Sequence, residues 1–173
     1  MRYLAFSLLL LTCIPHKERT GEVVLITDRD YLPFVKERID STRHTIHAIM
    51  YVGRYIPGGM VELLTQYLLG AEERGVEVRV IFEKSAYDSS LNATNEEFMK
   101  ILEEGGVEVR WDDSLTTTHA KLMVFDTSWV LIGSTNWTES ALEYNHEVNV
   151  GINSPELADQ VLSYFENLWR KND

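Results

Sequence analysis

Two short stretches of this sequence combine residue types that can bind and attack a phosphate. His119 and Lys121 stand two residues apart, and the stretch from Gly133 to Asn136 reads Gly-Ser-Thr-Asn. An imidazole is a nitrogen nucleophile, an ammonium balances phosphate charge, and hydroxyl and amide groups donate hydrogen bonds to nonbridging oxygens. The pattern therefore indicates phosphodiester chemistry. Because it offers no set of hard oxygen ligands, we expect catalysis with no metal and no cofactor.

Each of these side chains has an expected role and an ordinary alternative. We expect His119 to be the nucleophile and Lys121 to be its charge partner at the phosphate. Ser134 and Asn136 are expected to bind the nonbridging oxygens. The alternatives are a surface histidine, a solvated lysine at a strand edge, and two polar residues that cap a helix beginning near Thr138.

A predicted β-hairpin brings the two stretches to the same place. Residues 121–125 and 129–132 are apolar, strand-like runs, separated by only three turn-forming residues that begin with Asp126. Residues two apart on a strand face the same side, so His119 and Lys121 project together. The second strand returns the Gly-Ser-x-Asn stretch to them. Asp126 lies at the tip of the hairpin, where a turn-forming role is expected.

The rest of the chain alternates strands with helices. Expected strands lie near residues 23–26, 45–52, 76–82, 107–111 and 147–150, and expected helices near 31–41, 60–71 and 98–102 and from Pro155 onward. This alternation predicts one α/β domain, with a mixed, largely parallel sheet flanked by helices in an α-β-α sandwich.

The N-terminal segment is expected to lie outside that domain. Arg2 precedes a nearly unbroken apolar run over residues 3–11, which has the length of a signal-peptide core and is short for a bilayer span. Cys13 follows in a sequence similar to a lipoprotein cleavage box. We expect residues 1–20 to export the protein or anchor it to a membrane, and residues 21–173 to form the catalytic domain. The alternative is an N-terminal element packed on the domain.

Composition limits the partners. The chain has 27 acidic and 16 basic residues, for a formal net charge of −11. Such a charge disfavours the long-range attraction that general nucleic-acid binders use, so a phosphate site must be a local feature. The single cysteine excludes an intrachain disulfide.

Some side chains draw attention by their type alone. His47 is expected to be a satisfied core histidine. The four tryptophans, Trp111, Trp129, Trp137 and Trp169, are expected in the core or at an interface rather than as platforms for bases. Arg54 and Tyr55 follow a strand that should end near the same sheet edge, and whether they contact the substrate is left open.

The spacing of the motif resembles that of the phospholipase D superfamily, His-x-Lys-x4-Asp-x6-Gly-Ser-x-Asn. Every position of that pattern is filled, by His119, Lys121, Asp126, Gly133, Ser134 and Asn136. The resemblance extends from about Val23 to Trp169, and it is greatest for the small single-motif bacterial endonucleases and the mitochondrial phospholipase-D-like protein. In that branch a downstream glutamate orients the nucleophilic histidine, and Glu147 stands at the corresponding place.

The resemblance implies a two-step displacement through a phosphohistidine. One histidine attacks phosphorus, while a second protonates the leaving alcohol and then activates water. Because this chain carries the motif once, the resemblance implies a homodimer joined through its active-site face, with one His119 from each chain. The implied catalytic residues are His119, Lys121, Asp126 and Glu147.

Three functions remain open. The small single-motif architecture favours a metal-independent endonuclease acting on DNA or RNA. A phospholipase D acting on phosphatidyl lipids is favoured by the scarcity of cations, since only Arg110 and Lys121 lie near the motif in sequence. A noncatalytic phosphate-binding module is the third, although binding alone needs neither His119 nor Glu147.

Overall fold

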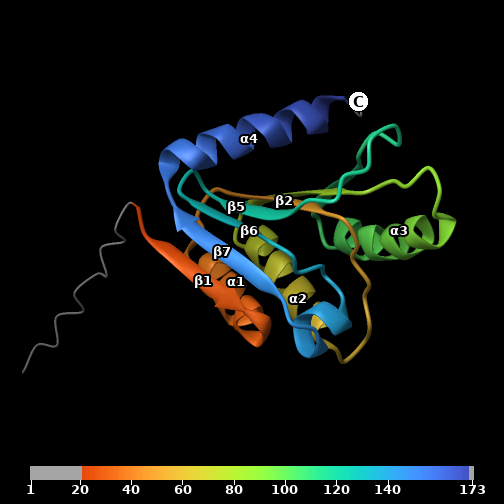
Figure 1. Cartoon of the computed structure of the whole chain (residues 1–173), viewed down its shortest axis with the longest axis horizontal. Helices are drawn as coiled ribbons and strands as arrows, with labels where there is room; N and C mark the ends of the chain where they lie inside the picture. Colours follow the sequence, from red (N-terminus) through yellow and green to blue (C-terminus); the bar gives the residue numbers. More distant parts are fainter. Residues whose placement is uncertain (1–20, 172–173) are drawn as a thin grey trace, which may run out of the picture.

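A single seven-stranded sheet forms the middle layer of the protein, with helices on both faces (Figure 1). The computed structural model describes residues 21–171. The expectations for the leader, including Cys13, lie outside the described residues. Helix α4 covers one face of the sheet, and α1, α2 and α3 lie on the other face.

The elements agree closely with the expected ones, except that the third helix begins nine residues before the expected run at residues 98–102. The strands are β1 (Val23–Thr27), β2 (Thr45–Met50), β3 (Glu77–Phe82), β4 (Glu108–Trp111), β5 (Lys121–Phe125), β6 (Trp129–Gly133) and β7 (Val148–Asn153). The helices are α1 (Tyr31–Ser41), α2 (Met60–Glu73), α3 (Ser89–Glu104) and α4 (Pro155–Arg170), with short turns at η1 (Asp28–Asp30) and η2 (Ser140–Tyr144).

The strand order is β1-β7-β6-β5-β2-β3-β4, which confirms a mixed α/β sandwich. Parallel pairing is confined to β2-β3-β4, whereas the other four neighbouring pairs are antiparallel. The balance of pair types therefore differs from the expected, largely parallel sheet. Helical crossovers make parallel neighbours, but the β5–β6 hairpin and its insertion beside β2 make antiparallel ones.

Two apolar cores separate the layers. The smaller core lies under α4, whose Phe165 and Trp169 pack on sheet residues such as Ile49 and Leu122. Helix α4 begins sharply because the Ser154 hydroxyl accepts a hydrogen bond from the Leu157 amide at 3.2 Å. The larger core fills the space between the sheet and α1, α2 and α3.

Three of the four tryptophans are buried, as expected for core residues. Trp129, Trp137 and Trp169 are at most 5% exposed, whereas Trp111 is partly buried at the sheet edge. His47 is also buried, with its ring 4.6 Å from that of Phe165. It is not fully satisfied, because Nδ1 has no partner in residues 21–171. Burial lowers the pKa of His47.

The carboxyl ends of β2 and β3 are tied together by one buried side chain, Asn95 of α3. Its Oδ1 accepts from the Gly53 amide at 2.9 Å, and its Nδ2 donates to the carbonyl oxygens of Tyr51 and Glu83 at 3.0 Å each. These main-chain groups lie beyond the ends of the ladder and would otherwise be left unpaired. Asn95 therefore sets the shape of this sheet edge.

At the opposite end of the strands, Asp126 begins the turn of the β5–β6 hairpin. Its φ of 51° is in the left-handed region, which aspartate tolerates better than most residues. The carboxylate accepts hydrogen bonds from the main-chain N–H groups of Arg43, His44 and Thr45 at 3.1, 2.8 and 3.0 Å. Asp126 thus fastens the start of β2 to the end of β5.

Replacing Asp126 tests this fastening. We expect Asp126→Ala to lower the free energy of unfolding by about 2–3 kcal/mol, because three amides lose a charged acceptor. Asp126→Asn is the matched control. It keeps one oxygen for the His44 and Thr45 amides, and it should cost only about 1 kcal/mol. Urea unfolding followed by circular dichroism measures both, and equal losses in the two variants would contradict the assigned contacts.

Candidate active site

His119 and Lys121 form one cluster at the start of β5. The Lys121 ammonium turns back on the preceding loop, where Nζ donates to the His119 carbonyl oxygen at 2.8 Å. It lies 3.2 Å from Nδ1 and 3.5 Å from Nε2 of the His119 ring. The histidine is exposed and the lysine is buried. The pairing places a positive charge directly beside an accessible imidazole.

Tyr51 completes this cluster, and the sequence reasoning missed it. Its ring centroid lies 4.5 Å from that of His119, and Lys121 Nζ lies 4.8 Å from the centre of the same ring. Tyr51 follows β2, which neighbours β5, with Met50 opposite Lys121. The only available signal was its place at a strand's carboxyl end, and recognising it requires knowing that β5 lies beside β2.

The environment of Lys121 changes its proton affinity. Burial lowers the pKa of the ammonium, and the nearby Glu147 carboxylate acts in the opposite direction. The tyrosine ring also attracts the cation through its negative face. Glu147 and the Tyr51 ring favour the charged form of Lys121 against the effect of burial, and the charged form is the one that binds a phosphate.

Glu147 is held in place by hydrogen bonds from several sides. Its carboxylate accepts from the Ser134 hydroxyl and from Asn145 Nδ2, the latter at 3.0 Å. Its main-chain amide donates to Asp28 Oδ1 at 2.8 Å. Asp28 lies in η1 with a φ of 50°, and the Glu147 amide lowers the pKa of its carboxyl. Asp28 is a second residue that the sequence reasoning missed, since only its turn-forming type was visible.

The expected contact between Glu147 and His119 does not occur within residues 21–171. The glutamate is bonded to Ser134 and Asn145, while His119 contacts Lys121 and Tyr51. An orienting role for Glu147 therefore requires a second chain or a rearrangement. The Ser134 hydroxyl likewise donates its hydrogen bond to Glu147. To donate to a phosphate instead, the hydroxyl must rotate away from Glu147.

The Gly-Ser-x-Asn corner is packed too tightly for a larger first residue. A Cβ on Gly133 would lie 2.1 Å from Oδ1 and 2.6 Å from Cα of Asn149 on β7. Asn149 also accepts from the Thr135 amide and donates to the Thr135 hydroxyl, at 3.3 and 2.8 Å. At the end of the corner, buried Trp137 donates from Nε1 to the Tyr31 hydroxyl at 3.1 Å.

Asn136 ends this corner and is half-buried. Its Oδ1 is buried and has no hydrogen-bond partner in the part of the chain that the structure describes. Such orphan atoms are rare in folded proteins and are often found where a ligand or another group completes the site. The alternative role as a helix cap is not used, because the Thr138 hydroxyl accepts from the Ala141 amide at 3.3 Å.

The remaining candidates lie away from this cluster. Asp126 stands at the far end of β5, about 16 Å along the strand from Lys121. Arg54 is exposed, and the Tyr55 hydroxyl donates to Glu62 at 3.0 Å. Arg110 lies over the Trp169 ring and donates to its carbonyl oxygen. The structure thus gathers His119, Lys121, Ser134, Asn136 and Glu147 at one edge and leaves these other residues out.

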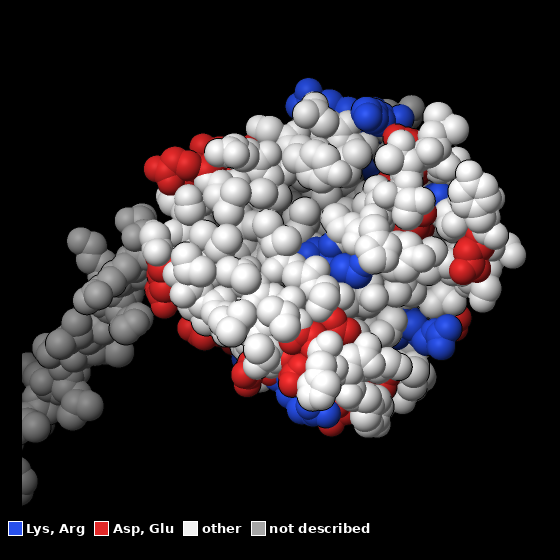
Figure 2. Space-filling view, in the orientation of Figure 1, with Lys and Arg blue, Asp and Glu red and all other residues white. Residues whose placement is uncertain are grey.

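Charge on the visible face is scattered. Figure 2 shows Lys and Arg in separate small groups, divided by neutral and acidic surface. Residues 21–171 contain no group of three or more His, Cys, Asp or Glu side chains that could hold a metal ion. Nor does any helix in this range have the length and apolar character needed to cross a membrane.

Comparison with known families places the site in context. Residues 35–169 match the family model described as "Cardiolipin synthase, PLD-like domain". Over 134 residues the chain is 30% identical to a phospholipase D of Rickettsia bellii, covering 78% of this chain and 60% of that protein. Over 116 residues it is 33% identical to the mitochondrial cardiolipin hydrolase of Mus musculus, covering 67% and 47%. The chain thus spans about half the length of these curated relatives.

Solved structures match nearly end to end. The phospholipase D family member Nuc from Salmonella typhimurium has a TM-score of 0.75 and 25% identity, covering 88% of this chain and 97% of that one. NucT from Helicobacter pylori has a TM-score of 0.70 at 20% identity, covering 86% and 96%, and shows the shared fold.

Replacing Gly133 tests the close packing of the corner. We expect Gly133→Ala to lower the free energy of unfolding by about 2–3 kcal/mol, because the new methyl group must displace the Asn149 backbone. Gly70→Ala in α2 is the control, since the atom nearest to its Cβ is 3.9 Å away. That helical substitution should stabilise by about 0.5–1 kcal/mol. Thermal unfolding of both variants is the measurement, and a neutral Gly133→Ala would mean that the corner can yield.

Proposed function

Since this chain belongs to the phospholipase D superfamily, we propose that it is a phosphodiesterase that cleaves its substrate through a phosphohistidine on His119. The observation that carries the proposal is the contact between the His119 ring and the buried Lys121 ammonium, 3.2 Å apart. A phosphate attacked by this imidazole would lie within reach of that charge. The charge would be worth most in the transition state, where negative charge on the phosphorane is greatest.

The proposed reaction has two steps. In the first, a nitrogen of His119 forms a bond to phosphorus, the bond to the leaving oxygen breaks, and a second histidine gives that oxygen a proton. In the second, the same histidine takes a proton from water, and the resulting hydroxide displaces His119 from phosphorus. Lys121 and Asn136 contact the nonbridging oxygens in both steps. Since these groups act without a metal, we propose metal-independent hydrolysis.

The second histidine must come from another chain, so we propose a homodimer with a shared site. An uncovered apolar face beside the site supports this proposal. Strand pairing places Leu25 and Ile132 on the face that α4 covers farther along, yet they are 68% and 41% exposed. Val148 on the same face is 56% exposed and follows Glu147 directly. A partner covering this face would bury these three apolar side chains next to the end of the sheet that carries the motif.

We propose nucleic acid as the substrate, which would make the protein an endonuclease. Its sequence resembles the small single-motif endonucleases, and its fold matches 97% of Nuc with a TM-score of 0.75. A phospholipase D activity is the second candidate. It is favoured by the net charge of −11 and by the two relatives whose names are phospholipase D and cardiolipin hydrolase.

A substrate panel in EDTA tests the reaction and separates the candidates. We expect hydrolysis of bis(p-nitrophenyl) phosphate and of single-stranded or duplex DNA, with phosphatidylcholine and cardiolipin left intact. His119→Asn should lower turnover by about 10³-fold or more without changing the melting temperature. His44→Asn, which alters an exposed histidine outside the site, is the control. Cleavage of lipid alone would favour the phospholipase, whereas binding without any cleavage would leave a noncatalytic module.

Mixing live and dead chains tests the shared site. If wild type and His119→Asn exchange subunits at random in equal amounts, about one quarter of the dimers keep two intact histidines. Activity should then fall to about a quarter of that of the same total protein as wild type. Independent sites would leave about half, as dilution requires. Native mass spectrometry of tagged chains must show exchange first, and a verified statistical mixture that keeps half its activity would overturn the shared site.

A further inference from the structure

Two carboxyl groups are buried together beside the loop that carries His119. Glu83 directly follows β3 and is 1% exposed, and Asp112 directly follows β4 and is 4% exposed. The two strands are parallel neighbours that end in register, with Phe82 opposite Trp111, so the next residues share one sheet edge. None of the salt bridges within residues 21–171 includes either carboxyl. Two buried like charges without a cation are strongly unfavourable.

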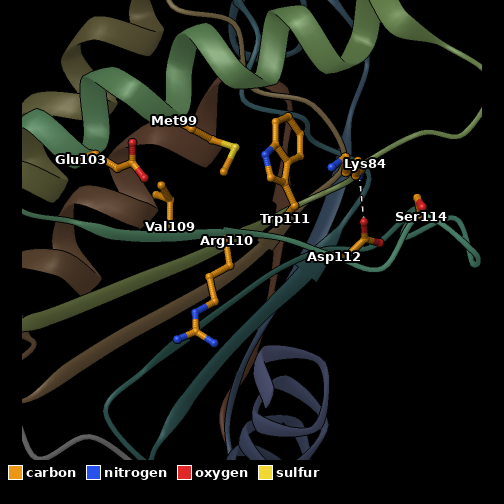
Figure 3. A pocket seen from close by; sticks show the side chains of 8 residues that line it. All are labelled: Lys84, Met99, Glu103, Val109, Arg110, Trp111, Asp112 and Ser114. Atoms are coloured by element: carbon orange, nitrogen blue, oxygen red, sulfur yellow. Dashed lines mark hydrogen bonds between the residues drawn. The ribbon is translucent and has the colours of Figure 1, made fainter. Parts of the chain in front are cut away.

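The hydrogen bonds around this pair leave one oxygen without a donor. Glu83 accepts from the Thr118 amide at 2.6 Å through Oε2. Asp112 Oδ1 accepts from the Lys84 amide at 2.8 Å, the dashed contact in Figure 3. Asp112 Oδ2 is buried and has no donor within residues 21–171. Glu83 and Asp112 directly follow the paired residues Phe82 and Trp111, so a proton held between the two carboxyls would give that oxygen a donor.

We propose that Glu83 and Asp112 share one proton, and that this acid pair positions His119 by holding the main chain at Thr118. Thr118 immediately precedes His119 in the sequence. The hydrogen bond from its main-chain amide to Glu83 attaches the end of the 113–118 loop to the end of β3. The loop otherwise turns on itself, since Asp113 accepts from two of its amides at 3.1 Å. Glu83 is thus a positioning residue, which does not touch the reacting atoms.

The shared proton makes the attachment dependent on pH. Burial raises the pKa of Glu83, the hydrogen bond from the Thr118 amide opposes this, and the nearby Asp112 and Asp113 carboxylates add to the rise, so the net shift is upward. The Lys84 ammonium does not pair with either carboxylate, because it lies over the Trp111 ring, 5.9 Å from the ring centre. A raised pKa means that the pair is fully favourable below the ordinary glutamate pKa of about 4.3, and that its contribution is lost as pH rises through the raised value. The loop should therefore loosen as the pH rises through that raised value.

Substituting an amide for the acid separates the proton from the packing. Glu83→Gln has nearly the same shape, its amide nitrogen can donate to Asp112, and its oxygen can still accept from Thr118 at every pH. Glu72→Gln is a matched control. Glu72 in α2 also accepts a main-chain hydrogen bond at 2.6 Å, from Val78, and burial raises its pKa, but this contact lies at the start of β3, away from Glu83.

Hydrogen exchange of the full chain tests the pair without relying on activity. Protection factors for the peptide over residues 113–120, corrected for intrinsic exchange, would be measured from pH 5 to pH 9. We expect the protection of the Thr118 amide to fall by about 10-fold or more in wild type and in Glu72→Gln, and to stay level in Glu83→Gln. A level wild-type profile, or the same fall in Glu83→Gln, would overturn the shared proton.

The positioning role rests on the proposed function and has its own readout. For bis(p-nitrophenyl) phosphate, both enzymes lose kcat as the general-acid histidine deprotonates, but wild type should lose more than Glu83→Gln, by about the same factor as the protection, while KM stays constant. If no substrate is cleaved by any variant, the proposed function fails while the exchange result still decides the pair. If cleavage occurs and the two alkaline profiles coincide, the positioning role is wrong.

Discussion

The candidate site depends on one buried amide, that of Asn95. Strands β2 and β3 end at the same edge, and beyond them the main-chain groups of Tyr51, Gly53 and Glu83 have no ladder partner. Asn95 satisfies all three from α3. This matters for the site because the Tyr51 ring packs on His119 and the Glu83 carboxyl holds Thr118. A side chain that touches neither histidine nor phosphate thus sets the position of both supports.

The local charge at the site contrasts with that of the whole chain. A protein with a net charge of −11 repels polyanions at long range, and its cations are scattered on the face shown in Figure 2. Lys121 nevertheless stands beside His119, supported by Glu147 and by the Tyr51 ring. Recognition of a phosphate would therefore depend on close contact with a few groups, with little electrostatic steering of the substrate.

The single chain supplies an incomplete version of the proposed mechanism. It has one motif histidine, its Glu147 is hydrogen-bonded to Ser134, and apolar side chains such as Ile132 and Val148 are exposed on one sheet face. All three features lie at the same end of β6 and β7. One partner chain seated on that face would account for them together. The proposed dimer would therefore supply the second histidine as well as cover apolar surface.

The sequence by itself determined the local structure and the chemical types at the site. Periodicity predicted the helices and strands to within a few residues, except that α3 begins at Ser89, nine residues before the expected run at 98–102. The spacing of His119, Lys121 and the Gly-Ser-x-Asn stretch around a hairpin predicted that they meet, because a two-residue period and a short turn act over neighbouring residues. Only the tertiary structure decided the rest. Tyr51, Asp28 and Glu83 join the site from distant segments because β5 inserts beside β2 and β7 lies between β1 and β6. Asp126, although part of the motif, lies at the far end of its strand. Strand order depends on the packing of whole faces, which no short pattern encodes.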